Sequence, residues 1–143
     1  MDLTVTRSNI MYFVSLISRY MEKPKEMHLL AAKRILRYLQ GTKDFGLFYE
    51  IGKRMDLLGY SDSDYAGDLD DRKSTSGYVF MMGTAAISWL SRKQPIVTLS
   101  TTEAEFVAAS ACVCQAIWLR NILEENQFKQ QGPTLIYCDI AQP

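Results

Sequence analysis

The first fifty residues place hydrophobic side chains at the spacing of helices. Apolar positions recur three and four residues apart along one segment: Ile10, Phe13, Val14 and Ile17. This spacing predicts an amphipathic helix with one apolar face. The apolar run from Ile10 to Ile17 is also about as long as the shortest apolar cores of signal peptides. Asp2, however, weakens the positively charged N-terminal region that such a peptide needs. The helix is therefore favoured, and a signal sequence in about residues 1–20 is the alternative.

A second helix is predicted after Pro24, from about Lys25 to Gln40. One face carries four apolar side chains: Ala32, Ile35, Leu36 and Leu39. Gly41 is a natural end for this helix, because glycine adopts the left-handed conformation that often closes a helix. A short strand is predicted next, at residues 45–49.

From Leu57 onward the period changes to that of strands. Residues 57–63 predict a buried strand, and the polar residues 64–76 predict a loop. Residues 77–82 and 85–90 predict two strands joined at Gly83-Thr84, a two-residue hairpin signal. A basic, polar turn is predicted at residues 91–95.

Ser100 and Glu103 form an S-x-x-E capping box that predicts the start of a long helix. The helix is expected to end near Asn126, and its predicted core contacts are Phe106, Val113 and Ile117. Residues 134–139 predict a last strand. The fold class is therefore α/β: a mixed sheet with one long helix, preceded by a two-helix segment. The predicted boundaries are residues 1–50 for the helical segment and 51–143 for the sheet domain.

Composition adds few constraints on function. Sixteen basic and 16 acidic residues give zero net charge, so any nucleic-acid contact has to come from a local basic patch. Such patches are predicted at Arg92 and Lys93, beside Trp89, and at Lys33, Arg34 and Arg37; a solvated rim is the alternative. No apolar run reaches about 18 residues, so no membrane-spanning helix is expected.

Three carboxylates occupy positions that could converge: Asp62 and Asp139 close predicted strands, and Glu103 lies in the first turn of the long helix. Carboxylates that converge cannot all stay ionised without a cation between them, and a pair of Mg²⁺ ions meets that need. Two such ions also support phosphodiester cleavage. Glu103 could equally serve only in the capping box, so spacing alone leaves both interpretations open.

Several sequence motifs resemble those of a known family in both order and spacing. They are Gly59-Tyr-Ser-Asp-Ser-Asp-Tyr-Ala-Gly-Asp68, Arg72-Lys-Ser-Thr-Ser-Gly-Tyr78, Ile87-Ser-Trp89, Ser91-Arg-Lys-Gln94 and Leu99-Ser-Thr-Thr-Glu-Ala-Glu-Phe106. These words resemble the ribonuclease H domain of copia-type retrotransposon polyproteins. The first fifty residues resemble the connection before that domain, including Ala32-Lys-Arg-Ile-Leu-Arg-Tyr-Leu39.

The resemblance implies a ribonuclease H-like sheet and three of the family's four metal-binding acids, Asp62, Glu103 and Asp139. It implies Mg²⁺ as cofactor, an RNA–DNA hybrid as substrate, and an intracellular retroelement particle as location. The fourth acid and a closing helix are expected beyond this chain, so the domain is interpreted as truncated. We therefore expect it to be non-catalytic, with vestigial acids.

A second word, Arg34-Ile35-Leu36-Arg37, matches the R-x-L-R signature of secreted oomycete effectors. This resemblance implies a secreted virulence protein that enters plant host cells, in nucleus or cytoplasm. It would need no cofactor and would suppress defence or cell death by contacting host proteins. The effector is the leading hypothesis, residual Mg²⁺-dependent ribonuclease H is an alternative, and a decayed gene fragment is another.

Overall fold

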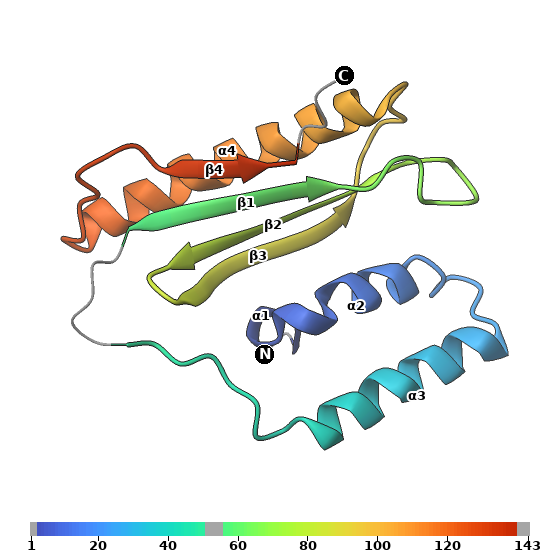
Figure 1. Cartoon of the computed structure of the whole chain (residues 1–143). Helices are drawn as coiled ribbons and strands as arrows, with labels where there is room; N and C mark the ends of the chain where they lie inside the picture. Colours follow the sequence, from blue (N-terminus) through green and yellow to red (C-terminus); the bar gives the residue numbers. More distant parts are fainter. Residues whose placement is uncertain (1–2, 51–55, 140–143) are drawn as a thin grey trace. The chain divides into compact units, whose positions relative to one another are not determined.

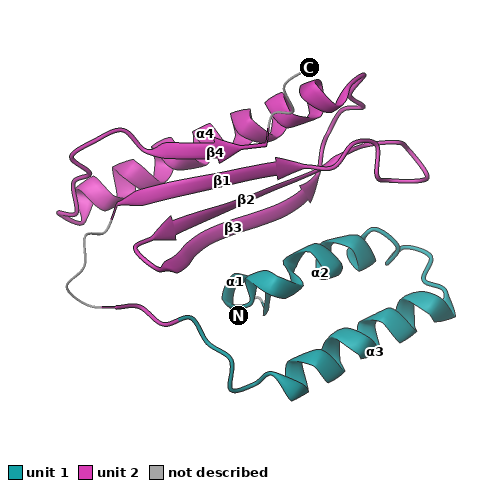
Figure 2. Ribbon diagram, viewed as in Figure 1, with its two compact units in different colours: residues 1–47 teal, residues 48–143 magenta. Residues whose placement is uncertain are grey.

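The computed structural model describes residues 3–50 and 56–139. The chain divides into two compact units, residues 1–47 and residues 48–143 (Figure 2). The first unit is helical and contains α1 (Leu3–Thr6), the 3-10 turn η1 (Ser8–Ile10), α2 (Met11–Ser18) and α3 (Glu26–Gly41). The second unit contains β1 (Leu57–Ser63), β2 (Thr75–Met82), β3 (Ala85–Lys93), α4 (Thr101–Glu125) and β4 (Leu135–Cys138). The predicted α/β class is confirmed.

In the first unit, α2 and α3 confirm the two predicted helices. The backbone N–H of Lys25 donates to Nδ1 of His28 at 3.0 Å, which satisfies one polar group at the start of α3. The predicted strand at residues 45–49 is wrong, since residues 45–50 have no regular secondary structure. No strand pairs with this segment among the described residues, and β-propensity alone does not hold an unpaired strand.

The sheet has the strand order β3-β2-β1-β4 (Figure 1). The β1–β2 and β2–β3 pairs are antiparallel, whereas β4 lies parallel to β1. Gly83 begins the predicted hairpin turn with a φ of 63°, a left-handed conformation that glycine adopts without steric cost. The predicted end of the next strand at residue 90 is wrong, because Arg92 and Lys93 still pair with Ser76 and Thr75.

One face of the sheet is covered by α4, which runs along β1 and β4 (Figure 1). The helix begins at the predicted cap, where the N–H of Glu103 donates to the Ser100 hydroxyl at 3.1 Å. Mostly small side chains of the helix are buried and let it approach the sheet closely: Ala104, Ala108, Cys112 and Ala116, followed by the larger Leu119. Cys112, Ala116 and Leu119 pack with Leu57 and Phe80 to form the core. A Cβ on Gly59 would lie 2.9 Å from a ring carbon of Phe80, so this position has no room for a side chain.

The predicted core contacts of the long helix are wrong. Phe106, Val113 and Ile117 are all exposed, Phe106 by 58%. Large hydrophobic side chains suggested the inward face, but close packing of the helix on the sheet selected the small ones instead. By length and apolar composition alone, α4 would also suffice to cross a membrane. That is weak evidence of a span, because core helices of soluble proteins meet the same criterion.

The loop between β1 and β2 is fixed by a partly buried ion pair. The Lys93 ammonium lies 2.7 Å from the carboxylate of Asp68 and 2.9 Å from that of Asp71. The Asp68 carboxylate also accepts hydrogen bonds from the backbone N–H groups of Asp70 and Asp71. The hydrogen bond from Lys93 holds the pKa of Asp68 far below its ordinary value, against the opposing effect of burial.

Replacing Phe80 by alanine should lower the free energy of unfolding by about 4 kcal/mol, because it removes a fully buried ring and leaves a cavity. Urea denaturation followed by circular dichroism measures this change. Leu69→Ala is the matched control: Leu69 is 86% exposed, and the loss should stay below about 0.5 kcal/mol. Equal losses in the two variants would contradict the observed core.

Asp68→Asn should cost about 3 kcal/mol at pH 7, because it leaves a partly buried Lys93 charge without its nearest partner. The lowered pKa of Asp68 gives stability that is present above about pH 3.8 and lost as the pH falls further. The difference between wild type and variant should therefore shrink below pH 3.8. Denaturation at several pH values measures it, with the exposed Asp70→Asn as control. A difference that persists unchanged at pH 2 would disprove the assigned role.

Candidate functional site

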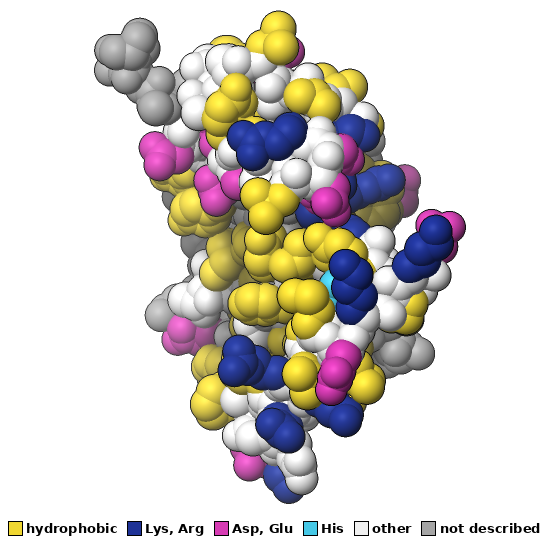
Figure 3. Space-filling view, turned by 90° about the vertical axis from the view of Figure 1, so that its right-hand side faces the viewer, with side chains coloured by type: hydrophobic (Ala, Val, Ile, Leu, Met, Phe, Trp, Pro, Cys, Tyr) yellow, Lys and Arg dark blue, Asp and Glu magenta, His cyan; other side chains and the backbone are white. Residues whose placement is uncertain are grey.

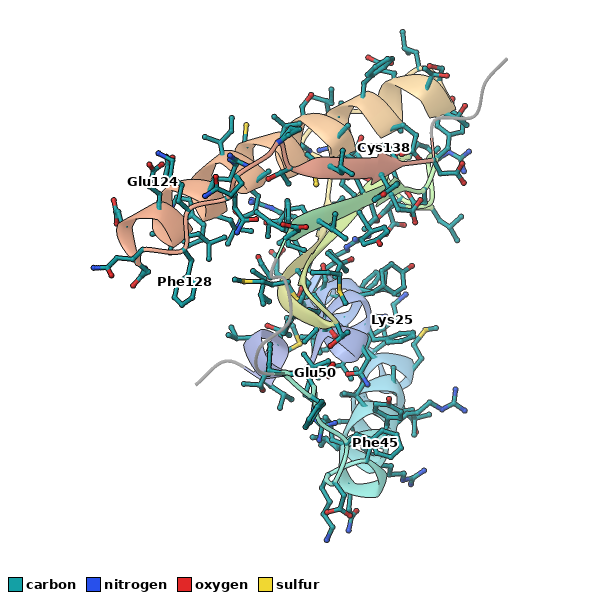
Figure 4. All side chains as sticks on the ribbon, turned by 60° about the vertical axis from the view of Figure 1, so that its left-hand side comes forward. Lys25, Phe45, Glu50, Glu124, Phe128 and Cys138 are labelled. Carbon is teal, nitrogen blue, oxygen red and sulfur yellow. The ribbon has the colours of Figure 1, made fainter. Side chains whose placement is uncertain are left out.

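Two of the predicted acids leave neighbouring strands at the same end of the sheet. In the parallel β1–β4 pair, Ser61 faces Cys138, and Figure 4 shows Cys138 at the end of β4. Asp62 and Asp139 are the next residues on the two strands. Both side chains are exposed. The topology therefore brings these two predicted site residues to the same end of the sheet.

The third carboxylate at this edge is Glu105, which the sequence analysis missed. Glu105 is only 8% exposed, and its Oε1 accepts a hydrogen bond from the backbone N–H of Ser63 at 3.2 Å. Burial raises the pKa of Glu105, and the negative charges of Asp62 and Asp139 raise it further. Its Oε2 is buried and has no hydrogen-bond partner among the described residues. Glu105 is thus a carboxylate held out of water, close enough to Asp62 and Asp139 for their charges to act on it.

Glu103 is placed elsewhere. Its carboxylate accepts a hydrogen bond from the backbone N–H of Leu99 at 2.6 Å, so it caps the start of α4. Two residues apart on a helix, Glu103 and Glu105 point about 200° apart, and only one can face the sheet. Glu105 shares the helical phase of Ala108 and Cys112, and this buried small-residue stripe was the signal that could have identified it.

Gln94 is a second residue that the sequence analysis missed. It follows β3, is buried, and its amide nitrogen donates to Ser76 Oγ at 2.8 Å, Ala104 O at 2.9 Å and Ser63 Oγ at 3.1 Å. Its backbone N–H donates to the carbonyl of Ser74 at 2.8 Å. These bonds connect β1, β2 and the first turn of α4. Gln94 thereby fixes the distance between Ser63 and the helix that carries Glu105.

The donor atoms at this edge suit a hard divalent cation in chemistry, since Mg²⁺ prefers carboxylate oxygens. The unpartnered Oε2 of Glu105 is an available donor, and the mutual repulsion with Asp62 and Asp139 would be relieved by positive charge. Over residues 3–50 and 56–139, however, no three Asp, Glu, His or Cys side chains are already grouped closely enough to hold an ion. The residue types fit a cation, whereas their present spacing is wider than that of a closed coordination sphere.

The two basic residues of the predicted patch at the end of β3 differ in their surroundings. Arg92 is exposed at the end of β3. Lys93 instead binds Asp68 and Asp71, and the hydrogen bond to Asp68 raises its pKa, so its charge is already neutralised within the loop. The sequence could not distinguish the two, because the carboxylates that pair with Lys93 lie more than twenty residues away along the chain.

The R-x-L-R residues lie on α3. Arg34, Leu36 and Arg37 are exposed, Leu36 by 63%, whereas Ile35 is half-buried. The predicted shared apolar face of Ile35 and Leu36 is therefore wrong for Leu36. The R-x-L-R motif is accessible on the helix, although it does not form a separate extended segment.

Known proteins resemble nearly the whole chain. The Retrovirus-related Pol polyprotein from transposon RE1 of Arabidopsis thaliana is 44% identical over 137 residues, which cover 96% of this chain and 9% of that polyprotein. The corresponding polyprotein from transposon TNT 1-94 of Nicotiana tabacum is 45% identical over 134 residues, 94% of this chain and 10% of its own length. This chain thus spans about a tenth of these polyproteins.

A shorter relative is Secreted RxLR effector protein 161 of Plasmopara viticola, which is 43% identical over 117 residues, 82% of each protein. No family model matches the chain. No solved structure matches it either. Because the chain covers most of this relative, the two belong to one family, and nearly the whole chain is similar to a segment of copia-type retroelement Pol polyproteins.

Proposed function

We propose that this chain supplies the cation-binding acids of a ribonuclease H-type site, which acts on RNA–DNA hybrids in a copia-type polyprotein. The observation that carries this proposal is the buried, unpartnered Oε2 of Glu105 beside Asp62 and Asp139. Carboxylates whose pKa is raised by burial and by neighbouring acids occur often at functional sites, because stability alone disfavours them. Divalent cations bound there would activate water and stabilise the leaving oxygen of a phosphodiester.

The residues around the acids have separate tasks in this proposal. Asp62 and Asp139 stay exposed and can approach a cation, whereas Glu105 is held from inside by the N–H of Ser63. Gln94 keeps Ser63 and α4 together and so preserves the position of Glu105. Arg92, which forms no ion pair among the described residues, is the basic side chain that would contact a phosphate of the hybrid.

The proposal predicts that Mg²⁺ or Mn²⁺ raises the melting temperature of the chain and that Glu105→Gln abolishes the rise. A ligand at about one hundred times its dissociation constant adds roughly 2.7 kcal/mol of stability, which a thermal melt detects. Glu105→Gln retains an oxygen that can accept from Ser63 but removes the charge. The melts are run against NaCl of equal ionic strength to separate binding from screening.

Glu103→Gln is the matched control for that experiment. It should lower the starting melting temperature slightly, because it weakens a helix cap worth about 1 kcal/mol, yet keep the cation-dependent rise. The opposite pattern, in which Glu103→Gln loses the rise and Glu105→Gln keeps it, would assign the site to the other carboxylate. Absence of any rise in the wild type would disprove the cation site.

A second candidate function is that of a secreted RxLR-type effector that enters plant host cells and suppresses defence by contacting host proteins. Two observations favour it: a relative of comparable length bears that name, and Arg34, Leu36 and Arg37 are accessible on α3. This function uses the chain as a scaffold and needs neither the acids nor a cofactor.

The effector candidate predicts that residues 1–20 direct secretion of a fused reporter. The apolar side chains of α2 would then serve as the core of a signal sequence, although the helix also suits packing within the protein. Reporter activity in the medium and in the cells measures this. Val14→Lys, which puts a charge in the apolar run, is the control and should block export. Retention of the unmodified fusion inside the cells would exclude the effector candidate.

A further inference from the structure

The first unit has little core of its own. Among its described residues, only one hydrophobic side chain, that of Ile10, is fully buried, although α2 and α3 are both amphipathic. Many hydrophobic side chains of the molecule lie at the surface (Figure 3). Those of the first unit include Tyr12, Phe13, Met27, Leu29, Leu30 and Leu36. A pair of helices this short does not usually bury enough apolar area to be stable without a partner.

The apolar faces of α2 and α3 enclose a half-open groove of about 860 Å³. Its apolar lining comes from the end of η1 and from both helices: Ile10, Phe13, Leu16 and Ile17, and Met27, Leu30, Ala31 and Ile35. Asn9 and Tyr38 close one side with a hydrogen bond. From Met27 to Tyr38 the lining follows α3 for about 16 Å, at 1.5 Å a residue, which is the length of a three-turn helix.

The charged side chains that line the groove are both basic. Arg34 and Arg37 both line it, and neither has an ion-pair partner among the described residues. No acidic residue lines the groove. Because the two arginines are three residues apart on α3, they present charges about one helical turn apart. A partner with carboxylates three or four residues apart on a helix would match that spacing.

We propose that this groove receives an amphipathic helix of about three turns that carries carboxylates along the edge facing Arg34 and Arg37. The apolar face of such a helix would cover the lining and complete a three-helix bundle, which is a common mode of peptide recognition. A second copy of α2 and α3 fits poorly. Residues 11–18 contain no acid and Glu26 is the acid of α3, so two copies would bring arginine against arginine.

The proposal is tested with the full chain and two synthetic, fluorescently labelled 14-residue peptides. Both have leucines at helical spacing on one face; one carries glutamates along the flanking edge and the other carries lysines. Fluorescence anisotropy gives the dissociation constants. The glutamate peptide should bind wild type at least tenfold more tightly than the lysine peptide does, and added salt should weaken it.

Arg34→Glu/Arg37→Glu should weaken binding of the glutamate peptide at least tenfold and strengthen that of the lysine peptide. The matched control is Lys33→Glu/Lys43→Glu, which makes the same charge change at exposed residues outside the groove lining and should alter binding less than twofold. Equal losses in both double variants, equal binding of the two peptides, or no binding alongside self-association of the chain would each overturn the proposal.

Discussion

The close packing of α4 on the sheet is the contact on which the rest of the second unit depends. It is possible because the inward side chains of the helix are small and because Gly59 leaves space for the ring of Phe80. The apolar side chains buried there form the core cluster of this unit, and their removal from water stabilises it. Since the packing fixes the rotation of the helix, it also decides which residues of its first turn face the sheet.

That rotation places the buried carboxyl group of Glu105 at the sheet edge. A carboxylate in this position opposes folding at neutral pH, since both burial and neighbouring acids favour its protonated form. The hydrogen bonds of Gln94 connect β1 and β2 to the first turn of α4 around this carboxylate. Energetically unfavourable groups that are supported in this way are typical of binding sites, where function rather than stability determines the residue.

The relatives of this chain differ greatly in length, and the chain itself exposes much apolar surface. The retroelement polyproteins that resemble this chain are about ten times longer, whereas the RxLR effector is of similar length. Extensive apolar surface remains on both α3 and the outer face of α4. Surfaces of this kind usually contact other protein segments. An effector could use the same surfaces for other partners, because a scaffold does not determine its function.

The sequence by itself determined the elements and their order: the α2 and α3 helices, the β1 strand, the hairpin turn at Gly83-Thr84 and the cap of α4 at Ser100. These depend on periodicity and on local hydrogen bonds between residues close in the chain. Tertiary structure alone decided the phase of α4, which turns Glu105 toward β1 and leaves Glu103 at the helix cap, as well as the pairing of Lys93 with Asp68. Both depend on groups far apart in sequence, whose proximity only the packed sheet creates.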